Sequence, residues 1–185
     1  MSTTYDREHL IQLIKEHALQ FGTFTLASGR TANFYLDCRK LTLHPKGANE
    51  IAAGMLELLG QPQPDAIGGM AIGADPISAA TITLAGQRGD PLLAFIVRKE
   101  AKQHGTGRQV EGPVEPGMSA VVVEDVVTSG GSALKAVDAA REFGLNVERI
   151  LAVIDRLEGG REAIEAAGLT LDTLVTVRDL GIGPD

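Results

Sequence analysis

Hydrophobic positions divide most of the chain into short, continuously apolar runs that alternate with amphipathic stretches. The runs are rich in Val, Ile, Leu and Ala, which is typical of parallel strands covered on both faces. Strands are expected at residues 66–70, 92–97, 120–124, 147–154 and 171–177. Helices are expected at residues 76–87, 133–143 and 162–167. This alternation predicts an α/β fold with a mainly parallel central sheet and helices on both faces.

The N-terminal part follows a different pattern. Apolar residues recur at helical spacing over residues 6–20, which predicts an amphipathic helix. Residues 25–38 are expected to form strand or irregular structure around a turn at 28–30. A further helix is expected over 45–60, because its proline suits a first helical turn. Residues 1–40 are therefore expected to form a helix and a small N-terminal segment that add to the central sheet.

Composition narrows the class of protein. At 185 residues the chain has the size of one domain, so residues 1–185 are expected to fold as a unit. A formal net charge of −7 argues against a general nucleic-acid binder, and no apolar run approaches membrane-spanning length. The single cysteine, Cys38, excludes an internal disulfide. Cys38 is expected to be buried. The lack of an internal disulfide, together with the polar N-terminus, favours a cytoplasmic location.

The strongest chemical signal is an apolar strand that runs into two carboxylates and then into a small, glycine-rich turn. Glu124 and Asp125 follow the valines of the strand, and the turn at 128–132 leads into the helix expected at 133–143. Backbone N–H groups at such a turn converge where a phosphate can bind. Carboxylates at the carboxyl end of a strand suit sugar hydroxyls. A phosphorylated ribose satisfies both features.

A plain structural turn is the alternative, because Thr, Ser and Gly also cap helices and permit tight backbone angles. The adjacent carboxylates favour a ligand site, since two neighbouring charges repel each other unless something binds them. Neither a Gly-x-x-x-x-Gly-Lys-Ser/Thr loop nor a Gly-x-Gly-x-x-Gly fingerprint occurs in the sequence.

A second signal is a basic, glycine-containing segment at 98–113. Between Arg98 and Arg108 it carries a formal charge of +3, although the whole chain carries −7. Such a segment is expected to be a mobile lid that meets a strongly anionic ligand. A solvated charged loop is the alternative, and its position after a strand's carboxyl end favours the lid.

These motifs resemble those of a known enzyme family. Residues 124–132 resemble the phosphoribosyl pyrophosphate (PRPP) signature of the type I phosphoribosyltransferases. Residues 98–105, Arg-Lys-Glu-Ala-Lys-Gln-His-Gly, resemble the catalytic loop of the orotate phosphoribosyltransferase family. Residues 24–30 are similar to its base-binding segment, and Asp155-Arg156 to its late orotate contact. The resemblance implies the type I phosphoribosyltransferase fold, with an N-terminal base-binding hood and a mobile lid.

The sequence departs from the better-known bacterial members at two positions. Those members have lysines at the positions of Ala27 and Gly73. Residues 68–74 still look like the family's pyrophosphate loop, because small residues let backbone amides approach an anion. A plain strand-to-helix turn is the alternative for this segment.

The resemblance also implies which residues act. The expected catalytic residues are Lys102, Arg98, Lys99 and His104. PRPP is expected to contact these four residues and also Ile72, Gly73, Glu124, Asp125, Val126, Val127, Thr128, Ser129, Gly130, Gly131 and Ser132. Orotate is expected to contact Thr128, Arg156, Ser28, Phe34 and Tyr35. For Arg156, a surface ion pair with Asp155 or Glu158 is the alternative.

The implied reaction transfers a phosphoribosyl group from PRPP to orotate in pyrimidine (UMP) synthesis. Mg²⁺ is the expected cofactor, held mainly by substrate and water rather than by side chains. The expected partners are the two substrates and a second copy of the chain, in a homodimer whose lids cross between subunits. Two alternatives remain: a purine or uracil phosphoribosyltransferase, and a non-enzymatic PRPP-sensing regulator. The basic lid argues against both.

Overall fold

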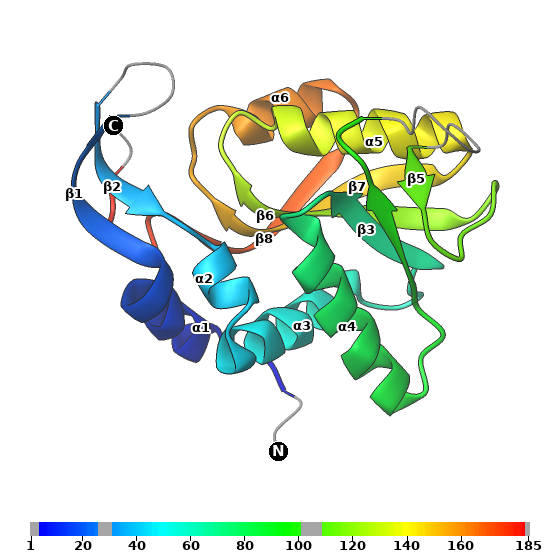
Figure 1. Ribbon diagram of the computed structural model, residues 1–185, viewed down its shortest axis with the longest axis horizontal. Coiled ribbons are helices and arrows are strands. Elements are labelled where there is room, and N and C mark those ends of the chain that lie inside the picture. Colours follow the sequence, from blue (N-terminus) through cyan, green and yellow to red (C-terminus); the bar gives the residue numbers. More distant parts are fainter. Residues whose placement is uncertain (1–3, 26–30, 101–108, 184–185) are drawn as a thin grey trace.

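A six-stranded sheet between two layers of helices forms the body of the computed structural model, which describes residues 4–25, 31–100 and 109–183 (Figure 1). The strand order is β5-β4-β3-β6-β7-β8, in which the edge strand β5 covers Val110–Glu111. The parallel strands are β3 (Ala66–Met70), β4 (Leu93–Val97), β6 (Ser119–Val127), β7 (Asn146–Asp155) and β8 (Thr170–Thr176). The mainly parallel sheet expected from the apolar runs is thus confirmed.

Each face of the sheet has its own hydrophobic core. One core packs under α1 (Arg7–Leu13), α3 (Pro45–Leu59) and α4 (Ala74–Arg88), and the other under α5 (Gly131–Phe143) and α6 (Gly160–Ala166). Figure 1 shows these helices on opposite sides of the sheet. Along β6, Val121 and Val123 enter the first core and Val122 enters the second. The run is continuously apolar because both faces are buried.

The carboxyl end of β6 extends further than the sequence pattern predicted. The strand was expected to end at Glu124, but pairing with β7 continues to Val127 opposite Asp155. Both carboxylates of the motif therefore belong to a hydrogen-bonded central strand. Within the described parts of the chain, no helix has the length and apolar character needed to cross a membrane.

The prediction of one helix over residues 6–20 is wrong. Helix α1 ends at Leu13, a π-helical turn covers Ile14–Ala18, and β1 (Leu19–Thr25) then pairs antiparallel with β2 (Thr31–Leu36). Phe21, whose position continues the helical spacing of apolar residues, is 71% exposed. Strand pairing replaces the helix because Leu19 and Leu36 are buried as partners in this small sheet. We call β1, β2 and the short helix α2 (Arg39–Thr42) the hood.

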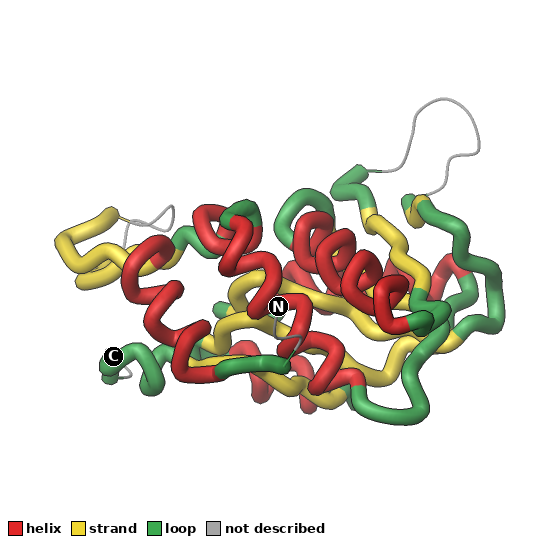
Figure 2. The backbone as a smooth tube through the Cα atoms, turned by 90° about the horizontal axis from the view of Figure 1, so that it is seen from below, coloured by secondary structure: helices red, strands yellow, loops and turns green. Residues whose placement is uncertain are grey.

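The segment expected to be a mobile lid, 98–113, includes a short strand. Strand β5 (Val110–Glu111) pairs antiparallel with β4, and Val110 is buried. At the base of the loop, the Arg98 N–H donates to the Gln109 carbonyl at 2.9 Å. In Figure 2 this base projects from the end of the sheet, away from the hood. The sequence missed β5 because two residues are too short to show a period.

Candidate active site

A cleft of about 360 Å³ lies where the carboxyl ends of the sheet meet the hood. The expected ligand-binding segments contribute Ile72, Gly73, Lys99, Glu124, Asp125, Val126, Thr128, Ser132, Arg156 and Tyr35 to its lining. The lining also includes Met70 and Ala71 of the expected pyrophosphate loop, and Leu36, Asp37, Cys38 and Arg39, which the sequence did not assign to a ligand site. Residues distant in the sequence thus share one cavity, as expected for a ligand site in an open α/β sheet.

The turn between β6 and α5 has the form of an anion site. The consecutive residues from Val126 to Ala133 line a smaller hollow of about 120 Å³. Gly130, the N-cap residue of the following helix, has a left-handed backbone with φ of 77° and, as a glycine, carries no side chain that could cap the helix. An uncapped helix start has free donors and a positive partial charge, which suit a phosphate.

A glycine from another segment supports this turn. Gly160 begins α6, and a Cβ there would lie 2.5 Å from Val127 Cγ1 and 2.6 Å from the Thr128 carbonyl oxygen. A Cβ on Gly130 would lie 3.0 Å from the Gly160 carbonyl oxygen. The two backbones therefore touch, and α6 holds the turn in place. The sequence prediction missed Gly160, although the Gly159-Gly160 pair was a visible signal for a close approach.

The paired carboxylates lie beside this turn, and one of them is buried. Glu124 is 7% exposed, and its Oε2 has no hydrogen-bond partner among the described residues. Burial, reinforced by the neighbouring charge of Asp125, raises the pKa of Glu124 to about 7. Asp125 accepts a hydrogen bond from the Val126 N–H at 2.9 Å. The pair can thus accept hydrogen bonds from hydroxyl groups or bind a cation. Either would relieve the repulsion between the two carboxylates.

The segment expected to be the pyrophosphate loop is shorter than predicted. Gly68 and Gly69 belong to β3, where a Cβ would collide with the backbones of Phe95 and Val123, so they serve strand packing. The turn itself is Ala71-Ile72-Gly73, before α4. A Cβ on Gly73 would lie 3.1 Å from Asp125 Oδ1, so this turn lies directly against the carboxylates.

Arg156 faces the cleft and also has the ion pair that was its alternative assignment. Its Nε donates to Glu158 Oε1 at 2.7 Å, and its guanidinium carbon lies 4.6 Å from the centre of the Phe34 ring. Phe34 therefore supports the cleft by packing against Arg156, whereas Tyr35 lines the cleft itself. A planar guanidinium held in this way can still present further donors to a carboxylate.

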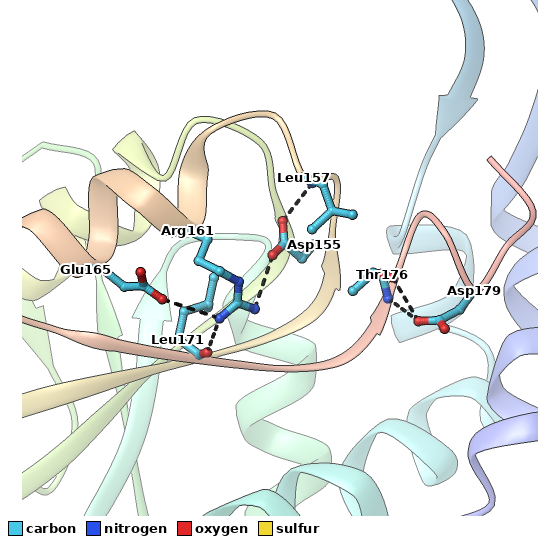
Figure 3. A network of polar contacts seen from close by, with 7 residues as sticks. All are labelled: Asp155, Leu157, Arg161, Glu165, Leu171, Thr176 and Asp179. Atoms are coloured by element: carbon cyan, nitrogen blue, oxygen red, sulfur yellow. Dashed lines mark hydrogen bonds and ion pairs between the residues drawn. The ribbon is translucent and has the colours of Figure 1, made fainter. Parts of the chain in front are cut away.

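Buried Asp155 fixes the turn that carries Arg156. Its Oδ1 accepts from the Leu157 N–H at 2.8 Å, and its Oδ2 lies 3.2 Å from Arg161 Nη2 (Figure 3). Leu157 has a φ of 57°, a rare conformation for a side chain of its size. The Asp155 hydrogen bond stabilises it.

Two of the four expected catalytic residues of the lid can be placed. Arg98 lies 3.5 Å from Glu111 in an exposed ion pair, and Lys99 lines the cleft. Lys102, His104 and Ser28 lie outside the described residues. Cys38 is 2% exposed, as expected, and burial raises the pKa of its thiol well above the ordinary value.

Comparison with known proteins agrees with this geometry. The crystal structure of Mycobacterium tuberculosis orotate phosphoribosyltransferase in complex with PRPP matches with a TM-score of 0.81 and 36% identity, over 95% of this chain and 99% of that one. The expected phosphoribosyltransferase fold is therefore confirmed. No family model matches the chain.

Curated relatives give the finer assignment. Orotate phosphoribosyltransferase of Rhodopirellula baltica is 57% identical over 99% of this chain and 98% of its own length. The Aquifex aeolicus enzyme of the same name is 45% identical over 95% of this chain and 97% of its own. The chain belongs to the orotate phosphoribosyltransferase family.

Proposed function

We propose that the chain transfers the phosphoribosyl group of PRPP to N1 of orotate, giving orotidine 5′-phosphate and diphosphate in UMP synthesis. The observation that carries this proposal is the shared cleft. Ser132 of the uncapped helix start, the carboxylate pair and Arg156 line it together. These features match the phosphate, the ribose hydroxyls and the base carboxylate of the two substrates.

Catalysis in such a site is mainly electrostatic. As the bond to diphosphate breaks, positive charge develops on the ribose ring and negative charge on the leaving group. Residues 128–132 hold the 5-phosphate, and Glu124 and Asp125 hold the ribose hydroxyls. Arg156 orients orotate, so that N1 approaches the ribose carbon that diphosphate leaves.

The carboxylate pair also fits the expected Mg²⁺. Carboxylate oxygens are suitable ligands, and the buried Oε2 of Glu124 has no hydrogen-bond partner within the described ranges. Those ranges contain no group of three metal-ligating side chains, so substrate and water oxygens would complete the shell. Bound Mg²⁺ would neutralise charge on the diphosphate.

The basic loop supplies the cations for the leaving group in this proposal. Lys102 is the principal catalytic residue, assisted by Arg98, Lys99 and His104. Closing the loop would also exclude water, which would otherwise hydrolyse PRPP. Support comes from Lys99, which already lines the cleft at the base of the loop.

The working unit we propose is a homodimer in the cytoplasm, with each loop closing over the partner's site. A groove of about 560 Å³ at the base of the loop supports a partner surface, since it is lined by charged residues 98–100 and by Ile72 and Ile96, which are 69% and 39% exposed. The test mixes inactive Lys102→Ala and Asp125→Asn chains. Crossed loops would give each mixed dimer one intact site, so about a quarter of native activity should return. Loops that serve their own chain would give none.

Base selectivity tests the proposed reaction. The protein, PRPP and Mg²⁺ are incubated separately with orotate, uracil, adenine and hypoxanthine, and the ultraviolet spectrum of each base is followed. We expect a spectral change with orotate alone. Conversion of another base, or of none, would contradict the proposal.

A further inference from the structure

Arg39 occupies the hood side of the cleft and is held in a defined position. Its Nε donates to Asp37 Oδ1 at 2.8 Å, and its Nη2 donates to Asp37 Oδ2 at 3.3 Å. The Arg39 side chain is nevertheless 54% exposed. Because Asp37 engages Nε and one Nη2 hydrogen, the Nη1 hydrogens are available to a ligand. The arginine is thus both oriented by the protein and accessible from the cleft.

The same cleft brings Arg39 together with the carboxylate pair and the Ala71-Ile72-Gly73 turn. Asp37 is the main cause of the raised pKa of Arg39, and the more distant charge of Asp125 acts in the same direction. The guanidinium therefore lies within electrostatic range of the place where donor ribose and Mg²⁺ are proposed to bind.

The turn itself cannot supply a cation to this place. Its three side chains are uncharged, and any Cβ at Gly73 would approach Asp125 Oδ1 to 3.1 Å. Among the described residues that line the cleft, the cations are Arg39, Lys99 and Arg156. Arg156 has the base carboxylate as its proposed partner, and Lys99 belongs to the basic loop. A diphosphate resting on the turn would need positive charge from another direction, and Arg39 provides it from the hood.

We propose that Arg39 binds the diphosphate group of the phosphoribosyl donor, with Asp37 as the positioning residue that orients its guanidinium. The inference rests on the proposed function and adds a residue to it. A guanidinium suits this task because two of its N–H groups can meet two phosphate oxygens at once. The proposal places binding of the leaving group on the hood as well as on the basic loop.

The test compares two ligands that differ only in the diphosphate. Affinities for PRPP and for ribose 5-phosphate, both in the presence of Mg²⁺, are measured by calorimetry. The proteins compared are wild type, Arg39→Ala and Arg39→Lys. Lys40→Ala is the matched control, because Lys40 is the neighbouring exposed cation and is absent from the cleft lining. We expect Arg39→Ala to weaken PRPP binding by about tenfold or more, the scale for a lost charged hydrogen bond, and to leave ribose 5-phosphate unchanged. Arg39→Lys should recover part of the loss.

Asp37→Asn separates positioning from charge. It keeps the arginine but weakens its ionic anchor, so we expect a smaller loss that again concerns PRPP alone. Equal losses for both ligands in Arg39→Ala, or a loss in Lys40→Ala as large as in Arg39→Ala, would overturn the assignment, as would unchanged PRPP affinity. Failure of the proposed function would appear differently, in wild type itself, as conversion of another base or of none in the base-selectivity assay.

Discussion

The two walls of the cleft are built differently. The phosphate wall, residues 124–132, continues a central strand whose Val122 and Val123 are fully buried, and α6 packs against its turn. The hood wall is a two-stranded sheet and a four-residue helix, with Phe21 and Tyr35 exposed. It joins the main core through Leu36 and Leu41, which are buried, and Arg156 stacks on its Phe34. We infer from this difference that the phosphate wall binds the phosphoribosyl part and that the hood wall binds the groups that arrive and leave.

The largest expected effect concerns the phosphate wall. Gly131→Asp places a carboxylate at the anion site, so PRPP affinity should fall by about a hundredfold or more, as measured by calorimetry. The fold should survive, because a Cβ at Gly131 would meet only Ser129 Oγ, at 3.8 Å. Gly130→Asp would be a poorer test, since its Cβ would be strained against Gly160. Gly131→Ala is the control and should bind nearly normally. Unchanged affinity in Gly131→Asp would mean that the turn is only structural.

The second prediction concerns Glu124 and pH. The native protein keeps the Glu124 proton up to a pKa of about 7, whereas the unfolded chain releases it near the ordinary value of 4.5. The native state therefore binds more protons between these values, and its stability falls as pH rises through this window. Glu124→Gln lacks this loss, so from pH 4.5 to pH 8 it should gain up to about 3 kcal/mol relative to wild type. Urea unfolding at both pH values measures the difference; a constant difference would contradict the raised pKa.

The third prediction tests the contact between α6 and the turn. Gly160→Ala should lower the free energy of unfolding by about 2 kcal/mol, because its methyl group overlaps Val127 and Thr128. Ribose 5-phosphate binding should weaken as well, since the turn must shift. Gly168→Ala has a strained φ of 75° but free space, so it isolates the backbone cost of about 1 kcal/mol. Equal urea stabilities for the two variants would argue against tight packing at Gly160.

The smallest expected effect concerns the base side. Arg156→Ala should raise the orotate KM by about tenfold, the scale of one charged hydrogen bond, and change the PRPP KM much less. Steady-state kinetics with each substrate varied gives both values. Glu158→Gln removes the ion-pair partner but keeps the arginine, so its orotate KM should stay near that of wild type. If Glu158→Gln raises the orotate KM as much as Arg156→Ala does, the ion pair rather than a base contact accounts for the effect of Arg156.

The same contrast explains what the sequence could predict. The phosphate wall was predicted because its strand, carboxylates and turn are contiguous, with a clear apolar run before them. The hood was predicted poorly, because the apolar spacing through Phe21 continues a helical period although the chain has already entered β1. Asp37 and Arg39 follow a short strand, and nothing local places them opposite Asp125. Gly160 acts through packing against a segment thirty residues away in sequence, which no local pattern reveals.

The division of labour between the two walls is tested most directly by the affinity for ribose 5-phosphate, a ligand that lacks both the base and the diphosphate. Calorimetric titration of wild type, Gly131→Asp and Arg156→Ala gives the three values under one set of conditions. We expect wild type and Arg156→Ala to bind it equally and Gly131→Asp to lose it. An Arg156→Ala loss as large as that of Gly131→Asp, or undiminished binding by Gly131→Asp, would contradict the account.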